Sequence, residues 1–174
     1  MNESPEERAT ALTQRITESN MSADLLFTQH SRSWQNWPAW YIDLISRIDL
    51  ITRTSPVLYL SSSLQEEQHG GSLFILTKKL VVHGAATAIQ RDKSGEVTVQ
   101  AWDRRELSRL EVLETDDRKA FDPGYRQVPY LRLRLTYQRG QSITLPLGNR
   151  PGMPAHRSIE EVFPHFLEDL TQRD

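Results

Sequence analysis

Histidines and acids at helical spacing are the residues of this sequence that could hold a metal ion or move protons. Glu161 and His165 are four residues apart, so they would share one face of a helix, as two ligands of a metal can. No third ligand follows at a recognisable spacing. The chain also contains no cysteine, which excludes disulfides and thiolate metal sites. We therefore interpret the pair as part of a solvated helix face and predict no metal site.

The motifs of nucleophilic and phosphate chemistry are also missing. The run Ser61-Ser62-Ser63 lacks the flanking glycines of a nucleophile elbow. Gly70-Gly71 is too short to cradle a phosphate and indicates a hairpin turn instead. The glutamate pairs at 66–67 and 160–161 are adjacent in sequence, so they do not converge as an acid and a base would. We predict a non-enzymatic protein with no catalytic residues and no cofactor.

Exposed cations are the candidates for binding an anionic ligand, and there are four of them: Arg91, Lys93, Arg132 and Arg134. The first two lie in a predicted hairpin turn, where paired cations usually serve only solubility. The other two alternate with leucines on one face of a predicted strand. Glu111 or Glu96 on neighbouring strands could neutralise them, since opposite charges on facing strands attract.

Tryptophans are the candidates for binding a partner protein, because this residue is enriched at interface hot spots. The four candidates are Trp34, Trp37, Trp40 and Trp102. The alternative is that the first three form the seam along which N-terminal helices pack, because Leu44, Ile48 and Ile51 continue the same face and need cover. Trp102 falls on the polar side of its strand, so it is either exposed or covered by those helices.

Length and charge exclude several classes of function. The 174 residues suit one domain with a sizeable core. Residues 1–54 carry five basic and seven acidic side chains, residues 55–150 carry fourteen and eleven, and residues 151–174 carry two and five. This excess of three positive charges in the middle is too small to indicate nucleic-acid binding. The acidic N-terminal segment has no apolar core, so we predict a cytoplasmic protein.

The first third of the sequence predicts helices. Ser4-Pro5-Glu6-Glu7 combines a cap, a proline at the first helical position and a capping box. A second start is expected at residues 22–24. A third helix is expected from about Pro38, with an apolar stripe that ends before Pro56.

From residue 57 the hydrophobic period changes to two, which predicts strands. The expected strands cover residues 57–60, 72–77, 80–90, 96–102, 107–113, 129–137 and 143–147, with a bend at Gly84. A final amphipathic helix is expected to begin at a second capping box, Ser158 to Glu161. Pro164 should kink or restart that helix.

Four segments of this pattern carry a resemblance to a known family. They are LFILTKKLVV (73–82), LSRLEV (107–112), the hairpin of residues 131–147 and the helix of residues 159–170. With them, the stretch 57–172 resembles the bacterial pleckstrin-homology-like (PH-like) domain. The resemblance implies an α+β fold in which seven antiparallel strands form a strongly bent barrel capped by the C-terminal helix. We therefore expect a PH-like domain at residues 55–174 and a helical extension, residues 1–54, packed on it.

The resemblance also bears on partners. Family members that bind phosphoinositides carry clustered lysines and arginines in the first hairpin loop, whereas this loop holds Glu66 and Glu67, so phosphoinositide binding is not expected. We predict a binding or scaffolding module that engages a protein partner or a second copy of itself. A partner would bind as a strand added to a sheet edge or as a helix in a groove. The alternative is peripheral membrane or anionic-ligand binding through the basic surface.

Overall fold

A computed structural model gives the arrangement of the chain. It describes residues 4–19, 36–65, 69–88, 95–115, 131–147 and 154–171. In chain order its elements are α1 (Pro5–Ser19), α3 (Ala39–Thr52), β1 (Val57–Ser62), β2 (Gly70–Thr77), β3 (Leu80–Thr87), β4 (Glu96–Asp103), the 3-10 turn η2 (Arg104–Glu106), β5 (Leu107–Thr115), β6 (Leu131–Tyr137), β7 (Ser142–Leu145) and α4 (Pro154–Thr171). The protein is therefore α+β, as the sequence predicts.

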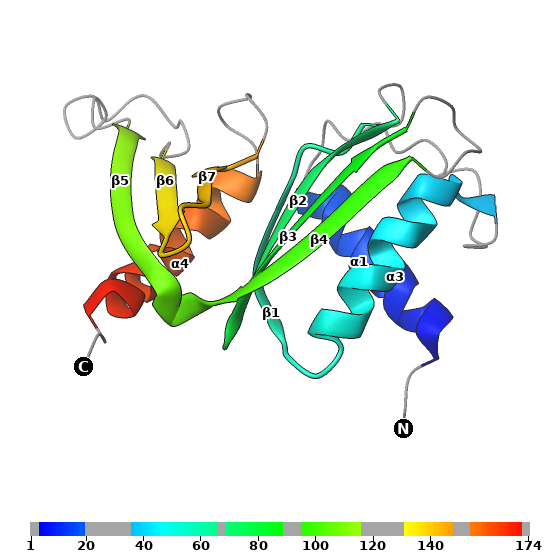
Figure 1. The fold of residues 1–174 in the computed structure, drawn as a ribbon, viewed down its shortest axis with the longest axis horizontal. Coiled ribbons are helices and arrows are strands. Elements are labelled where there is room, and N and C mark those ends of the chain that lie inside the picture. The colour runs from blue at the N-terminus through cyan, green and yellow to red at the C-terminus, as the bar shows by residue number, and fades with distance from the viewer. Residues whose placement is uncertain are drawn as a thin grey trace, which may run out of the picture.

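The strands form two antiparallel sheets. The first has the order β1-β2-β3-β4 and the second the order β5-β6-β7. Figure 1 shows α1 and α3 on one side of the first sheet, with the second sheet and α4 on its other side. The first sheet is thus covered on both faces, which explains why residues 73–76 of β2 are all apolar and buried.

The capping box predicted at the start of α1 is confirmed. The Ser4 N–H donates to Glu7 Oε2 at 2.7 Å, and the Glu7 N–H donates to Ser4 Oγ at 3.2 Å. The first of these bonds, from the Ser4 backbone, is the larger cause that lowers the pKa of Glu7 below its ordinary value. The helix start expected at residues 22–24 lies outside the described residues.

One hydrophobic core joins α1 and α3 to the first sheet. Ile16, Leu44 and Ile48 pack there with residues of β2 and β3. Gly84 does not interrupt β3, because pairing runs through it without a register shift on both sides. A Cβ at this position would lie 2.8 Å from Leu44 Cδ1, so the glycine allows α3 to approach the sheet closely.

Arginines and a hydroxyl pair fix the two helices in place. Arg8 of α1 pairs with Asp49 of α3 at 2.8 Å, and Tyr41 donates to Thr13 Oγ1 at 3.0 Å. Two further arginines bond to strand carbonyls, namely Arg15 to Val57 O of β1 and Arg47 to Val97 O of β4. Since β1 and β4 are the edge strands of the first sheet, each edge receives one arginine from a helix.

The second core lies between the two sheets and under α4. Its members include Phe74, Leu76, Leu133, Leu135 and Phe166, all with no exposed surface. Helix α4 packs against β5, β1 and η2. It begins at Pro154, not at the capping box expected from Ser158, and it continues through Pro164. Proline suits the first turn of a helix because no partner is needed for its nitrogen there.

The expected closed barrel is wrong, because the two sheets do not join into one ladder. Strand β7 has only four residues and is followed by Pro146, which has no N–H to continue a ladder. Just after β7, the Leu147 N–H donates to the side-chain Oγ of Ser61 in β1 at 2.7 Å, so the sheets are joined here by a side-chain bond. At the other corner, η2 separates β4 from β5, and Asp103 caps it.

Among the described residues, no helix has both the length and the apolar character that crossing a membrane requires.

Phe166 should be essential to the second core. Its side chain has no exposed surface, so Phe166→Ala should lower the free energy of unfolding by about 3–5 kcal/mol. Leu167, its neighbour on α4, is 44% exposed, and Leu167→Ala should change stability by less than about 0.5 kcal/mol. Urea denaturation of both variants checks this. Equal losses would show that burial on this helix does not govern stability.

The division of the chain at residue 54 can be tested by truncation. Deleting residues 1–54 would uncover the face of the first sheet that carries Leu73, Ile75 and Val82. A bare apolar face of this kind promotes association, so we expect the 55–174 fragment to aggregate. Size-exclusion chromatography measures this. A fragment that is monomeric and as stable as the full chain would contradict the expectation.

Candidate functional site

Arg104 connects three segments that are distant in sequence. Its side chain has five N–H donors, and five hydrogen bonds use them. Two go to the carboxylate of Asp169 on α4, at 2.8 and 2.9 Å. The other three go to the carbonyl oxygens of Thr77, Lys78 and His165, at 3.2, 3.4 and 3.3 Å. Arg104 is 8% exposed and Asp169 6%, so the pair is buried.

The turn between β2 and β3 is fixed from two sides. On one side, Arg104 bonds to three successive carbonyls, because its own N–H also donates to Lys79 O at 3.0 Å. On the other, Thr77 Oγ1 accepts from the N–H groups of Lys79 and Leu80 and donates to Leu80 O. The turn that carries Lys78 and Lys79 therefore has little conformational freedom left.

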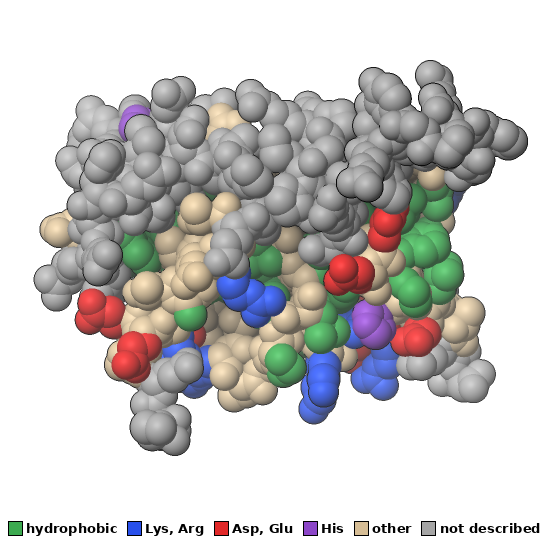
Figure 2. All heavy atoms as spheres, turned by 180° about the vertical axis from the view of Figure 1, so that it is seen from behind, with side chains coloured by type: hydrophobic (Ala, Val, Ile, Leu, Met, Phe, Trp, Pro, Cys, Tyr) green, Lys and Arg blue, Asp and Glu red, His purple; other side chains and the backbone are tan. Residues whose placement is uncertain are grey.

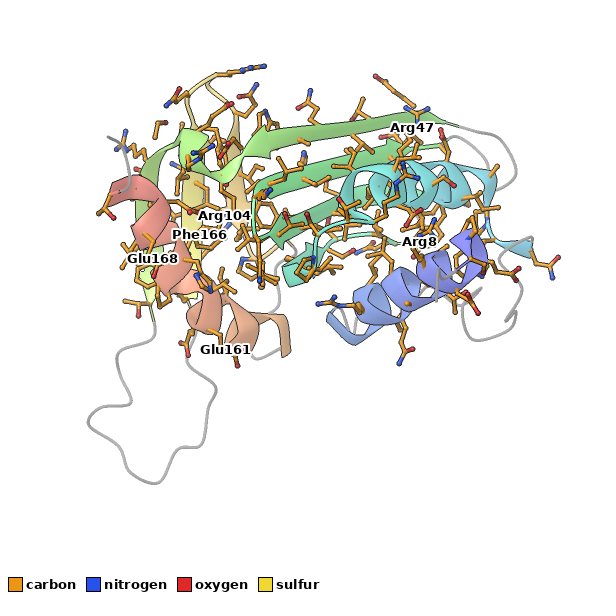
Figure 3. All side chains as sticks on the ribbon, turned by 90° about the horizontal axis from the view of Figure 1, so that it is seen from below. Arg8, Arg47, Arg104, Glu161, Phe166 and Glu168 are labelled. Atoms are coloured by element: carbon orange, nitrogen blue, oxygen red, sulfur yellow. The ribbon has the colours of Figure 1, made fainter. Side chains whose placement is uncertain are left out.

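A charged pocket of about 490 Å³ opens where this turn, η2 and α4 meet. Its lining residues are Lys78, Lys79, Asp103, Arg104, Arg105, His165, Glu168 and Asp169. Figure 2 shows basic, acidic and histidine side chains gathered at the end of the molecule where α4 lies. In Figure 3, Arg104, Phe166 and Glu168 lie together at that end, whereas Arg8 and Arg47 lie on α1 and α3.

Most charges in the charged pocket are already paired. Arg105 holds Asp103 through two bonds of 2.7 and 3.0 Å, and Arg104 holds Asp169. His165 Nδ1 lies 3.4 Å from Glu168 Oε2, a contact that is an ion pair only when the imidazole is protonated. Within the described part of the chain, the exposed side chains of Lys78 and Lys79 have no ion-pair partner.

Two pKa shifts follow from these contacts. The hydrogen bond from the Arg105 side chain is the main cause that lowers the pKa of Asp103 below its ordinary value. Burial raises the pKa of Tyr137 above its ordinary value, and the negative charge of Asp169 adds to this effect. The Asp103 carboxylate therefore stays ionised at neutral pH, and the Tyr137 hydroxyl stays neutral.

The tryptophans proposed for partner binding lie in the cores. Trp37 and Trp40 are 7% and 0% exposed in the first core, so they form the seam that packs the N-terminal helices. Trp102 is also buried, but it stacks on Tyr137 of the second sheet, with ring centroids 5.7 Å apart, and is not covered by those helices. None of these three offers a surface to a partner, and Trp34 lies outside the described residues.

The arginine strip on the second sheet is neutralised across strands. Arg134 lies 3.7 Å from Glu111, as expected, and Arg132 lies 3.3 Å from Glu114, where Glu96 was the other expected candidate. Both pairs follow the β5–β6 register. The other two candidate anion contacts, Arg91 and Lys93, lie outside the described residues.

On the last helix, the histidine of the Glu161–His165 pair makes an ion-pair contact with another acid. His165 Nδ1 lies 3.4 Å from Glu168 Oε2. Figure 3 shows Glu161 closer than Glu168 to the N-terminal end of α4. Among the described residues, no three histidines and acids gather closely enough to hold a metal ion.

Sequence reasoning missed the residues of the charged pocket, although two signals were present. Asp169 lies on the apolar stripe of α4, four residues after His165 and three after Phe166, and an acid in such a stripe needs a buried partner. Lys78 and Lys79 are two of only four lysines in the chain, and they are adjacent in a predicted hairpin turn. No local feature marks Arg104, because its partners come from other segments.

Comparisons of the chain with protein-family models, with curated proteins and with solved structures find no match. The site is therefore interpreted from its own geometry.

The buried pair predicts a strong effect of removing one partner. Arg104→Met leaves Asp169 buried without a counter-charge and deprives the β2–β3 turn of its donor, so stability should fall by about 3–5 kcal/mol. The double variant Arg104→Met/Asp169→Leu should recover part of this loss, because the uncompensated charge is gone. Urea denaturation measures both.

Arg105→Met is the matched control for this prediction. Arg105 also binds an aspartate through two bonds, but its side chain is 71% exposed, so the substitution should cost less than about 1 kcal/mol. If Arg104→Met cost no more than Arg105→Met, the buried pair would not hold the site together.

Proposed function

We propose that this chain is a non-enzymatic binding module with a PH-like domain at residues 55–174, and that it acts in protein–protein interaction. The order of the strands supports the family assignment. Four antiparallel strands in sequence order are followed by three more, and then by a helix whose Phe166 fills the core between the sheets. The resemblance in the sequence implies the same order of elements.

We place the contact with the partner at the charged pocket. The observation that supports this is the pair Lys78 and Lys79, two exposed cations without ion-pair partners on a turn held by Arg104 and Thr77. A site that is ordered before binding loses little conformational entropy when a partner docks, so its charges contribute more to affinity. Elsewhere on the described surface, the arginines of the second sheet are paired with glutamates.

Two of the three acids in the charged pocket are held by arginines, which supports binding rather than catalysis, and the third, Glu168, contacts His165. General acid–base chemistry needs a proton-transferring group that is free to reach a substrate. Here Asp103 and Asp169 are each held by two bonds from an arginine. Their role in this geometry is to orient Arg105 and Arg104.

The alternative is membrane or anionic-ligand binding through the basic surface, and the ion pairs weigh against it. A surface that attracts anionic lipid needs several cations of unopposed charge. Arg132 and Arg134 face Glu114 and Glu111 across the β5–β6 ladder, and Glu111 also pairs with Arg109 at 3.0 Å, so the group keeps an excess of only one positive charge. Charge binding of this kind would also be lost as salt is raised.

Charge reversal in the charged pocket tests the proposed function. The tagged full chain is used to capture partners from the organism that makes it. Lys78→Glu/Lys79→Glu should lower recovery of a specific partner by about tenfold or more, because like charges at an interface repel. The matched control is Arg132→Glu/Arg134→Glu, which makes the same change of charge on the second sheet.

The control decides how the experiment is read. A partner lost with the pocket variant and retained with the strip variant supports docking at the charged pocket. A partner retained by both variants would overturn the placement of the site, and so would a partner lost equally from both.

A further inference from the structure

We infer that the charged pocket recognises an acidic segment of a protein, a short run of aspartates and glutamates, through Lys78 and Lys79. The inference rests on the proposed binding function and names the chemistry of the partner. It starts from the side chains that line the pocket, which include four lysines and arginines and three acids. Arg104 pairs with Asp169 and Arg105 with Asp103, so Lys78, Lys79 and Glu168 remain, with an excess of one positive charge carried by the β2–β3 turn.

The buried part of the pocket is closed to a ligand, and the exposed part is open. Arg104 and Asp169 are engaged with each other, and all five side-chain donors of Arg104 are in use. A ligand therefore meets the rim, where Lys78, Lys79 and Arg105 are exposed. A site whose free charges lie at its rim suits a segment that passes across it better than a small molecule that is enclosed.

Carboxylates fit this rim better than a phosphate group. Compact phosphate recognition commonly uses the fork of an arginine, and both arginine forks here are filled by Asp103 and Asp169. Glu168 also lies in the lining and would repel a doubly charged phosphate more than a single carboxylate. Successive acids of an extended segment are spaced along the chain, so one can meet each lysine while the segment avoids Glu168.

The rigidity of the turn strengthens this preference. The backbone of residues 77–80 is bonded to Arg104 on one side and to Thr77 Oγ1 on the other. The backbone that carries the two lysines is therefore already ordered, and only the rotamers of their side chains must be ordered on binding. The sequence Lys-Lys places them on adjacent residues, which matches a run of acids rather than one isolated charge.

A labelled hexaglutamate peptide tests the inference with the full chain. Fluorescence anisotropy at low salt should show binding, and Lys78→Gln/Lys79→Gln should weaken it by about tenfold, the product of two exposed charge contacts. The control Arg132→Gln/Arg134→Gln should bind like the unaltered chain. Hexalysine should not bind, and hexaglutamate binding should weaken as salt rises, because the Debye length falls below about 10 Å beyond 0.1 M.

Inorganic phosphate provides the competing chemistry. Phosphate and free glutamate are compared as competitors at the same total concentration of negative charge. If phosphate displaced hexaglutamate under conditions in which free glutamate did not, the preference for carboxylates would be overturned. Equal affinity of the pocket variant and the strip variant would overturn the role of the lysines. Both lysines are exposed, so the double variant should have the melting temperature of the unaltered chain. If its melting temperature is lower, the single variant Lys79→Gln replaces it.

The two experiments fail in different ways. A chain that captures its partner through Lys78 and Lys79 but does not bind hexaglutamate keeps the proposed function and overturns this inference. A chain that binds hexaglutamate through the lysines but captures no partner keeps the inference and overturns the proposed function.

Discussion

The bond between Arg104 and Asp169 is the constraint on which the arrangement around the charged pocket depends. It links the corner between the two sheets to α4, and through the Thr77 and Lys78 carbonyls it also holds the β2–β3 turn. A buried ion pair adds little net stability, because desolvation of the two charges offsets their attraction. What it does is penalise every other packing of α4, since any shift of this helix would leave a buried charge without a partner. The pair therefore fixes where α4 lies on the second core.

The first sheet is the structural centre, because both cores are built on it. Its strands alternate between a face that meets α1 and α3 and a face that meets the second sheet, so each strand contributes to two clusters. The N-terminal helices are accordingly part of the folded unit: Gly84 admits α3 closely, and arginines from both helices occupy the two sheet edges. On each edge strand, an arginine of this kind occupies one of the carbonyls that a further strand would use. The proposed contact with a partner lies elsewhere, at the end of the molecule near α4.

Local patterns predicted the elements, and long-range contacts decided what the patterns could not. The capping box at Ser4 and Glu7 and the alternation along β6 act within a few residues, so the sequence predicts them directly. Trp102 shares its strand face with Gln100, and alternation alone predicts that both lie on the polar face of β4. The second sheet covers this face only near the β4–β5 corner. It therefore buries Trp102 and leaves Gln100 exposed. Barrel closure failed for a similar reason, because it depends on pairing between distant strands. The sequence did not predict the charged pocket, because Arg104 and Asp169 are 65 residues apart.

Two kinds of charged surface on the same molecule clarify where binding is to be sought. On the second sheet, register places Glu111 and Glu114 opposite Arg134 and Arg132, so each of these two arginines has an acid on the neighbouring strand. At the β2–β3 turn the lysines form no ion pair within the described residues, although three acids line the same pocket: Asp103 and Asp169 bind their own arginines, and Glu168 contacts His165. Lys78 and Lys79 form no ion pair with the acids of the pocket, and their turn is fixed by bonds from both sides. This arrangement favours pairing with an anion of a partner over pairing with an acid of the same chain.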